Sequence, residues 1–201
     1  SNVAMVLLAN LNMPVNDVKG LVAELKAQPS KYSYASYGAG TSAHFAAEIA
    51  LSAMGVKMLQ VPYRGSAPAM TDLIGGQIAF SMDTVTAALP QLKAGKVKAI
   101  AVTSAQRSPQ LPNVPTFTES GYPLDVTSWG MMAASPGLPP AVRAKLEKAL
   151  EAVIADPEVR RSFAAQGVEA RFESGAKAAA RIERELPLMR AVAARTGIQA
   201  N

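Results

Sequence analysis

The chain has 201 residues, of which 49% are hydrophobic and 17% are charged, and it contains no cysteine and a single histidine. This apolar content excludes an intrinsically disordered chain, because it is enough to build a packed core. The absence of cysteine excludes a disulfide scaffold and thiolate metal sites, and one histidine is too few for the common imidazole sites of zinc and iron. We therefore expect a globular protein with no metal and no cofactor.

The charge is moderately basic, since 20 Lys and Arg residues oppose 15 Asp and Glu residues, which gives a formal net charge of +5 and a pI near 9.6. The basic residues are spread along the chain, whereas nucleic-acid-binding proteins gather them on one face or in a run. The charge thus favours attraction of small anions over binding of nucleic acid. No segment approaches the roughly 18 consecutive apolar residues of a membrane span, and the first residues lack the pattern of a signal peptide.

The first hundred residues alternate between short apolar runs bounded by turn formers and segments with helical periodicity. This alternation predicts strand followed by helix, repeated about four times, which is typical of an α/β unit with a mainly parallel sheet. The predicted strands cover residues 6–8, 32–36, 56–61, 78–82 and 97–103, and the predicted helices centre on residues 18–25, 46–53, 70–74 and 85–92.

The character of the sequence changes at a proline-rich stretch over residues 108–123, which predicts an ordered connection across the surface. One more apolar strand is expected over residues 126–134. Helical periodicity follows over residues 142–153, a short helix is expected to begin at Asp156-Pro157, and a last helix should be kinked at Pro187. The tail holds too little β-structure to form an independent domain, so we expect it to pack on something else.

The most informative local feature is the segment 36–44, Ser-Tyr-Gly-Ala-Gly-Thr-Ser-Ala-His, between a predicted strand and a predicted helix. Gly38 and Gly40 permit a tight turn with exposed amides, and Thr41 or Ser42 is expected to cap the helix. Free N–H groups and the helix dipole together favour an anion there. The segment lacks the lysine of a P-loop and the spacing of a dinucleotide fold, and an ordinary glycine turn with a cap remains the alternative.

His44 lies three residues into that helix and has no second histidine or cysteine for a partner. A nucleophile elbow would read G-x-S-x-G, which is absent here. We therefore interpret His44 as hydrogen-bonded to a neighbouring loop. An enzyme is disfavoured, because no base, nucleophile and orienting group fall in a recognisable spacing.

Polar residues also follow the next two predicted strands. Arg64 and Gly65 come after residues 56–61, with Ser66 expected to cap the following helix, and Asp83 follows residues 78–82. In open parallel sheets, ligands bind outside the carboxyl ends of the strands, so three such loops at one edge suit a small anion such as a carboxylate. The alternatives are an ordinary surface guanidinium for Arg64 and a helix cap for Asp83.

Seven segments, in this order, resemble one family: the extracytoplasmic solute-binding receptors of tripartite tricarboxylate transporters, also called the TctC or Bug family. The resemblance covers essentially the whole chain, and the segments are specific as a set although none is specific alone. They are residues 37–44, 61–69, 72–77, 101–104, 107–109, 111–116 and 156–160.

The resemblance implies a type II periplasmic-binding-protein fold, in which two lobes close on a small carboxylate without performing chemistry. It implies a periplasmic location and the membrane subunits of the transporter as partners. A cytoplasmic ligand-sensing domain of the same architecture is the alternative, although such domains usually carry a helix-turn-helix that this chain lacks. The ligand-binding residues that it implies are Ser36, Tyr37, Gly40, Thr41, Ser42, His44, Arg64, Gly65 and Asp83.

The chain departs from the family in two ways. Tyr37 stands where many members have a small polar residue, so an aromatic ring is expected to narrow the pocket or stack on an uncharged part of the ligand. The signal peptide and most of the first lobe are also missing. We therefore expect residues 1–125 to form the second, ligand-binding lobe, and residues 126–201 to supply the hinge-return strand and C-terminal helices of an incomplete first lobe. Surface left open in this way predicts self-association.

Overall fold

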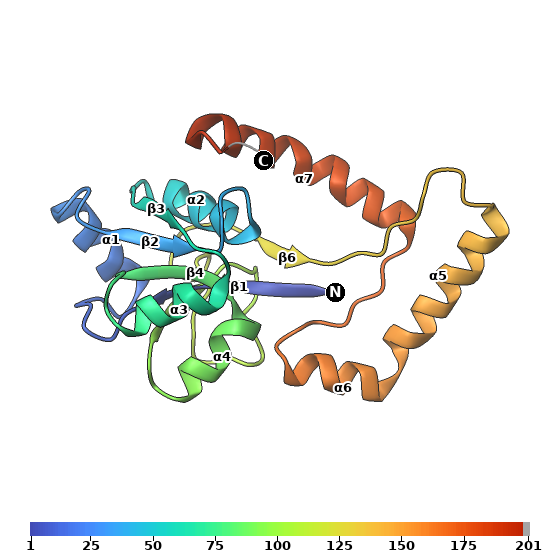
Figure 1. The fold of residues 1–201 in the computed structure, drawn as a ribbon, viewed down its shortest axis with the longest axis horizontal. Helices are drawn as coiled ribbons and strands as arrows, with labels where there is room; N and C mark the ends of the chain where they lie inside the picture. Colours follow the sequence, from blue (N-terminus) through green and yellow to red (C-terminus); the bar gives the residue numbers. More distant parts are fainter. Residues whose placement is uncertain (199–201) are drawn as a thin grey trace.

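The structure is a computed structural model that describes residues 1–198, and its elements follow one another as an α/β unit and then a mostly helical tail (Figure 1). The strands are β1 (Asn2–Ala9), β2 (Ser33–Ser36), β3 (Leu59–Pro62), β4 (Phe80–Thr84), β5 (Lys98–Val102) and β6 (Thr127–Trp129). The helices are α1 (Val18–Ala27), α2 (Ser42–Met54), α3 (Ser66–Ile74), α4 (Val85–Lys93), α5 (Pro140–Ala155), α6 (Pro157–Ala165) and α7 (Gly175–Thr196). The predicted alternation of strand and helix over the first hundred residues is confirmed.

The main sheet has the strand order β3-β2-β4-β1-β5. Strand β2 pairs in parallel with β3 and β4, as expected, but β1 is antiparallel to β4, β5 and β6. The expectation of a mainly parallel sheet is therefore wrong for the pairings of β1. The connection from β4 through α4 to β5 leaves a gap one strand wide, and β1 fills that gap in the opposite direction.

Helices cover both faces of this sheet because successive residues of β1 point to opposite sides. Met5 and Leu7 pack with α1 and α2 in one apolar cluster, whereas Val6 and Leu8 pack with α3 and α4 in another. All four of these side chains are buried. The result is a three-layer arrangement that fixes the position of each loop at the sheet edge.

Strand β1 is shared between this unit and the rest of the chain. Its first part, Asn2 to Ala4, pairs with β6, and its later part pairs with β4 and β5. On the side away from β6, Asn2, the first residue of β1, pairs with Glu169 through two backbone hydrogen bonds of 3.0 and 2.8 Å. The tail is thus attached to the unit chiefly through the first residues of the chain.

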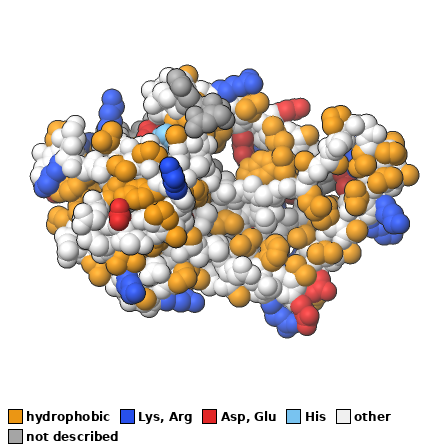
Figure 2. Space-filling model, in the orientation of Figure 1, with side chains coloured by type: hydrophobic (Ala, Val, Ile, Leu, Met, Phe, Trp, Pro, Cys, Tyr) orange, Lys and Arg blue, Asp and Glu red, His pale blue; other side chains and the backbone are white. Residues whose placement is uncertain are grey.

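The tail has far fewer buried side chains than the α/β unit. Helices α5 and α6 have no buried residue, and α7 has only Val192. Figure 1 shows α5 and α6 standing away from the sheet, while α7 passes over α2. Apolar side chains gather on the surface around α5 in Figure 2. The large exposed ones between residues 131 and 155 are Met131, Met132, Val142, Leu146 and Val153.

One expectation about the tail needs correction. The strand predicted over residues 126–134 is only Thr127–Trp129, because residues beyond Trp129 have no strand to pair with and are exposed. Helix α7 runs from Gly175 to Thr196 with Pro187 inside it, and the kink at this proline stays a prediction. Among residues 1–198, no helix is both long and apolar enough to cross a membrane.

Candidate functional site: the loops at one edge of the sheet

Three helices begin at the same edge of the sheet, directly after β2, β3 and β4. Helix α2 is capped by Thr41, whose Oγ1 accepts from the amide of His44 at 3.5 Å and donates to the carbonyl of Gly38 at 2.8 Å. Of the two caps that the sequence allows, Thr41 and Ser42, the structure thus has Thr41. Because three helix dipoles point their positive ends at this edge, the edge favours negative charge.

The glycine loop at residues 36–44 is held in place by its own hydrogen bonds. Ser36 is fully buried, and its Oγ accepts from Gln60 Nε2 at 2.7 Å and donates to the carbonyl of Gly38 at 3.2 Å. Gly38 has a φ of +132°, and a Cβ atom there would lie 3.3 Å from Thr41 Cγ2. This turn therefore requires glycine, and Ser36 supports the loop from beneath.

His44 acts on the loop in the way that the sequence favours. Its Nδ1 accepts from the amide of Gly40 at 3.2 Å, which leaves Nε2 to carry the proton of the neutral ring. Burial lowers the pKa of His44, and nearby Glu48 only partly opposes this effect. The imidazole is therefore neutral near pH 7 and orders the loop without supplying charge.

The first turn of α2 leaves one exposed amide open for an anion. Within residues 1–198, the N–H of Ser42 has no hydrogen-bond acceptor and Ser42 is exposed, whereas Ala43, whose N–H also lacks an acceptor, is completely buried. Tyr37 lies against this turn, with its OH 3.3 Å from Ser42 Oγ. Burial raises the pKa of Tyr37, and the charge of Asp83 adds to this increase although the Ser42 hydrogen bond opposes it. Its hydroxyl is therefore protonated.

The β3–α3 loop differs from its prediction. Gly65, with a φ of +121°, is the N-cap of α3 and no side chain caps that helix, so the expectation that Ser66 caps it is wrong. Ser66 is instead the first helical residue, and its Oγ donates to Asp83. Arg64 is exposed, and in the part of the chain that the structure describes it forms no ion pair.

Asp83 joins the second and third loops from below. It is 1% exposed, and it accepts from Ser66 Oγ and from the amide of Thr84, the latter at 2.7 Å. Burial raises the pKa of Asp83, although these hydrogen bonds hold part of the increase back. Thr84, rather than Asp83, caps α4. Asp83 thus acts as a buried support between loops, since its side chain does not reach the surface.

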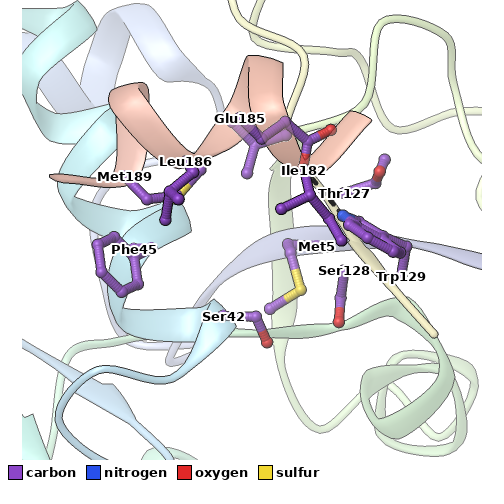
Figure 3. A pocket seen from close by; sticks show the side chains of 11 residues that line it. Met5, Ser42, Phe45, Thr127, Ser128, Trp129, Ile182, Glu185, Leu186 and Met189 are labelled. Carbon is purple, nitrogen blue, oxygen red and sulfur yellow. Dashed lines mark hydrogen bonds between the residues drawn. The ribbon is translucent and has the colours of Figure 1, made fainter. Parts of the chain in front are cut away.

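A cavity of about 310 Å³ adjoins this edge, between the start of α2, the strands β1 and β6, and the helix α7 (Figure 3). Of the nine predicted site residues only Ser42 lines it. Part of the cavity wall could be found in the sequence, because Ile182, Leu186 and Met189 repeat on one face of a predicted helix. The sequence did not indicate which residues would lie opposite that face. The other lining residues are Met5, Phe45, Val126, Thr127, Ser128, Trp129 and Glu185.

Comparison with known proteins identifies the family. The family described as "Tripartite tricarboxylate transporter family receptor" matches residues 1–195. The chain belongs to this receptor family. Its fold is accordingly the periplasmic-binding-protein-like mixed α/β fold that the resemblance implied. Among residues 1–198, no group of three or more His, Cys, Asp or Glu side chains is placed to hold a metal ion.

Individual relatives agree with this assignment. The "UPF0065 protein in tcbD-tcbE intergenic region" of Pseudomonas sp. (strain P51) is 36% identical over 166 residues, which are 82% of this chain and 49% of that protein. The chain thus spans about half the length of this relative.

Two solved structures are similar over nearly all of the chain. "R. palustris Rpa4515 with adipate" superposes with a TM-score of 0.89 and 29% identity, covering 98% of this chain and 67% of that one. The periplasmic binding protein BugD superposes with a TM-score of 0.82 and 35% identity, covering 100% of this chain and 68% of that one.

Proposed function

We propose that this chain takes part in capturing a small organic carboxylate outside the cytoplasmic membrane and delivering it to a tripartite tricarboxylate-type transporter. The observation that carries the proposal is the first turn of α2, where exposed Ser42 offers an amide without an acceptor and a hydroxyl, beside two further helix N-termini. The family assignment and a similar structure that holds adipate support the ligand class.

In this proposal the residues divide into two roles. The carboxylate is bound by the amide and the hydroxyl of Ser42 and by the Tyr37 hydroxyl, and the exposed guanidinium of Arg64 attracts it. The other six predicted site residues hold the three loops in shape: Ser36, Gly40, Thr41, His44, Gly65 and Asp83. The receptor family to which the chain belongs supports a binding protein rather than an enzyme.

We also propose how the chain is divided. Residues 1–125 form the complete second, ligand-binding lobe, and residues 126–201 provide the return strand and C-terminal helices of the first lobe, of which residues 199–201 lie outside the described part. The remainder of that first lobe corresponds to the part of the relatives that this chain does not span. The carboxylate would then be held at the sheet edge of the first unit, on the side where β6 crosses back.

Isothermal titration of the chain with acetate, succinate, adipate and malate tests the proposal. At least one of them is expected to bind, and to raise the melting temperature, because a ligand that binds only the native state stabilises it. Ser42→Ala should weaken that binding about 10- to 100-fold by removing one hydrogen bond to a charged group. Ser52→Ala, at the exposed far end of the same helix, is the matched control and should change nothing. Absence of binding by every carboxylate would contradict the proposal.

A further inference from the structure

The cavity beneath α7 has a strongly apolar wall. Met5 is completely buried at the base of the cavity, and Phe45 projects into it from α2. Figure 3 shows Ile182, Leu186 and Met189 of α7 pointing toward these residues from the opposite side. The volume of about 310 Å³ lies within the range of small-molecule pockets.

This cavity is continuous with the open first turn of α2. Ser42 belongs to both, because its amide is open for an anion and its side chain lines the cavity. The Tyr37 hydroxyl lies 3.3 Å from Ser42 Oγ and 4.0 Å from Met5 Sδ, so it stands where the polar edge meets the apolar wall. A molecule bound by its carboxylate at α2 therefore has the cavity directly beside it.

The one charged side chain among the lining residues is already neutralised. Glu185 accepts from Arg181 Nε at 2.7 Å and from Trp129 Nε1 at 2.9 Å. Its two oxygens are thus paired, with Arg181 only 13% exposed. The cavity offers no unpaired cation for a second carboxylate, and burying a carboxylate without a partner is costly.

We propose that this cavity receives the apolar body of the ligand, whose single carboxylate lies at the first turn of α2. The inference rests on the proposed function and adds the substrate class: carboxylates with one charged end and an apolar body. Ser42 and Tyr37 mark the boundary between the two ends, and the walls formed by Phe45 and Leu186 select for chain length.

The first test compares butyrate, hexanoate and octanoate by isothermal titration, with adipate as the doubly charged counterpart of hexanoate. Each buried methylene should tighten binding about fourfold until the chain outgrows the cavity. Hexanoate should bind more tightly than adipate, which has the same number of carbons. Equal affinities along the series, or tighter binding of adipate, would overturn the inference while leaving carboxylate capture intact. Failure of every carboxylate, acetate included, would overturn both.

The second test blocks the cavity. Leu186→Trp, at a lining residue that is 42% exposed, should weaken octanoate at least tenfold and leave acetate unchanged. Leu188→Trp is the matched control, since Leu188 lies on the same helix, is 50% exposed and does not line the cavity. Equal octanoate affinity in both variants would overturn the inference. If Leu186→Trp fails to fold, Ile182→Phe at another lining residue makes the same comparison.

Discussion

Helices α1 and α5 both repeat apolar residues on one face, yet the apolar face is buried in α1 and exposed in α5. The 10 residues of α1 bury four apolar side chains against the sheet, whereas the 16 residues of α5 bury none. Leu25 in α1 is 4% exposed and Leu146 in α5 is 45% exposed. The comparison teaches that periodicity shows which face of a helix is apolar, while only the rest of the fold decides whether that face is covered.

The strongest way to test this contrast is to remove a large side chain from each region. Phe80→Ala in β4 should lower the free energy of unfolding by about 3–5 kcal/mol, because Phe80 is fully buried and the change leaves a cavity. Leu146→Ala in α5 should change it by less than about 0.5 kcal/mol. Urea unfolding at low protein concentration measures both. A loss of similar size in the two variants would contradict the contrast.

The exposed apolar residues between 131 and 155 should drive association between copies of the chain. Light scattering after size-exclusion chromatography is expected to give at least twice the mass of one chain, because a large apolar patch in water is unfavourable. The double variant Leu146→Glu with Val153→Glu should restore the mass of a single chain. Leu59→Glu, at a residue of β3 that is 71% exposed, is the control and should not. A stable monomer of the unmodified chain at all concentrations would contradict this prediction.

The attachment of the C-terminal tail to the α/β unit depends on Arg181 of α7. Its guanidinium donates to Asn2 Oδ1 at 2.9 Å, to Thr127 Oγ1 at 3.0 Å and to Glu185, and it lies over the Trp129 ring at 4.6 Å. Arg181→Ala should therefore cost about 1–3 kcal/mol, because it removes the donor to Asn2 Oδ1 and Thr127 Oγ1 and the positive charge paired with Glu185.

Hydrogen exchange measures where that cost falls. Faster exchange is expected in α7 and β6, with the α1–α4 unit unchanged. Arg184→Ala, one turn away with 71% of its side chain exposed, should lie within about 0.5 kcal/mol of the unmodified chain. Uniformly faster exchange throughout the unit would show that the two regions unfold together.

The smallest expected effect is a pH dependence confined to the glycine loop. Burial lowers the pKa of His44 in the folded state below its ordinary 6.5, so its contribution to stability is complete above pH 6.5 and is lost as the pH falls through the folded value. His44→Asn keeps an acceptor for the Gly40 amide but cannot titrate.

Comparing the unmodified chain with His44→Asn isolates the effect of His44, because Asp83 is present in both. The pKa of Asp83 is raised, so its contribution to stability changes with pH in the direction opposite to that of His44. Burial of Asp83 stabilises the fold at low pH, and this stability is lost as the pH rises through its folded pKa. Urea midpoints between pH 7.5 and 5 should fall more in the unmodified chain than in His44→Asn. An equal fall in both would place the pH dependence elsewhere.

Local chemistry explains what could be predicted from the sequence. The Thr41 cap, the glycine turn and the His44 hydrogen bond depend on residues within a few positions of one another, so their spacing was informative. Ser66 was misassigned because its partner, Asp83, lies 17 residues away in the next loop. The antiparallel direction of β1 and the wall that faces α7 depend on packing across the whole chain, which no local pattern encodes.

The position of β1 also determines when the sheet can be completed during synthesis. Its residues leave the ribosome before those of all its partner strands: the strands that flank it end at Thr84 and Val102, and the partner of its first three residues, β6, ends only at Trp129. Until β4 has been made, a nascent chain holds a buried-type strand with no neighbour, and closing such long loops slows folding. The order of the strands therefore delays completion of the sheet until Trp129 has been made, and it leaves the apolar run of β1 accessible to chaperones before its neighbours arrive.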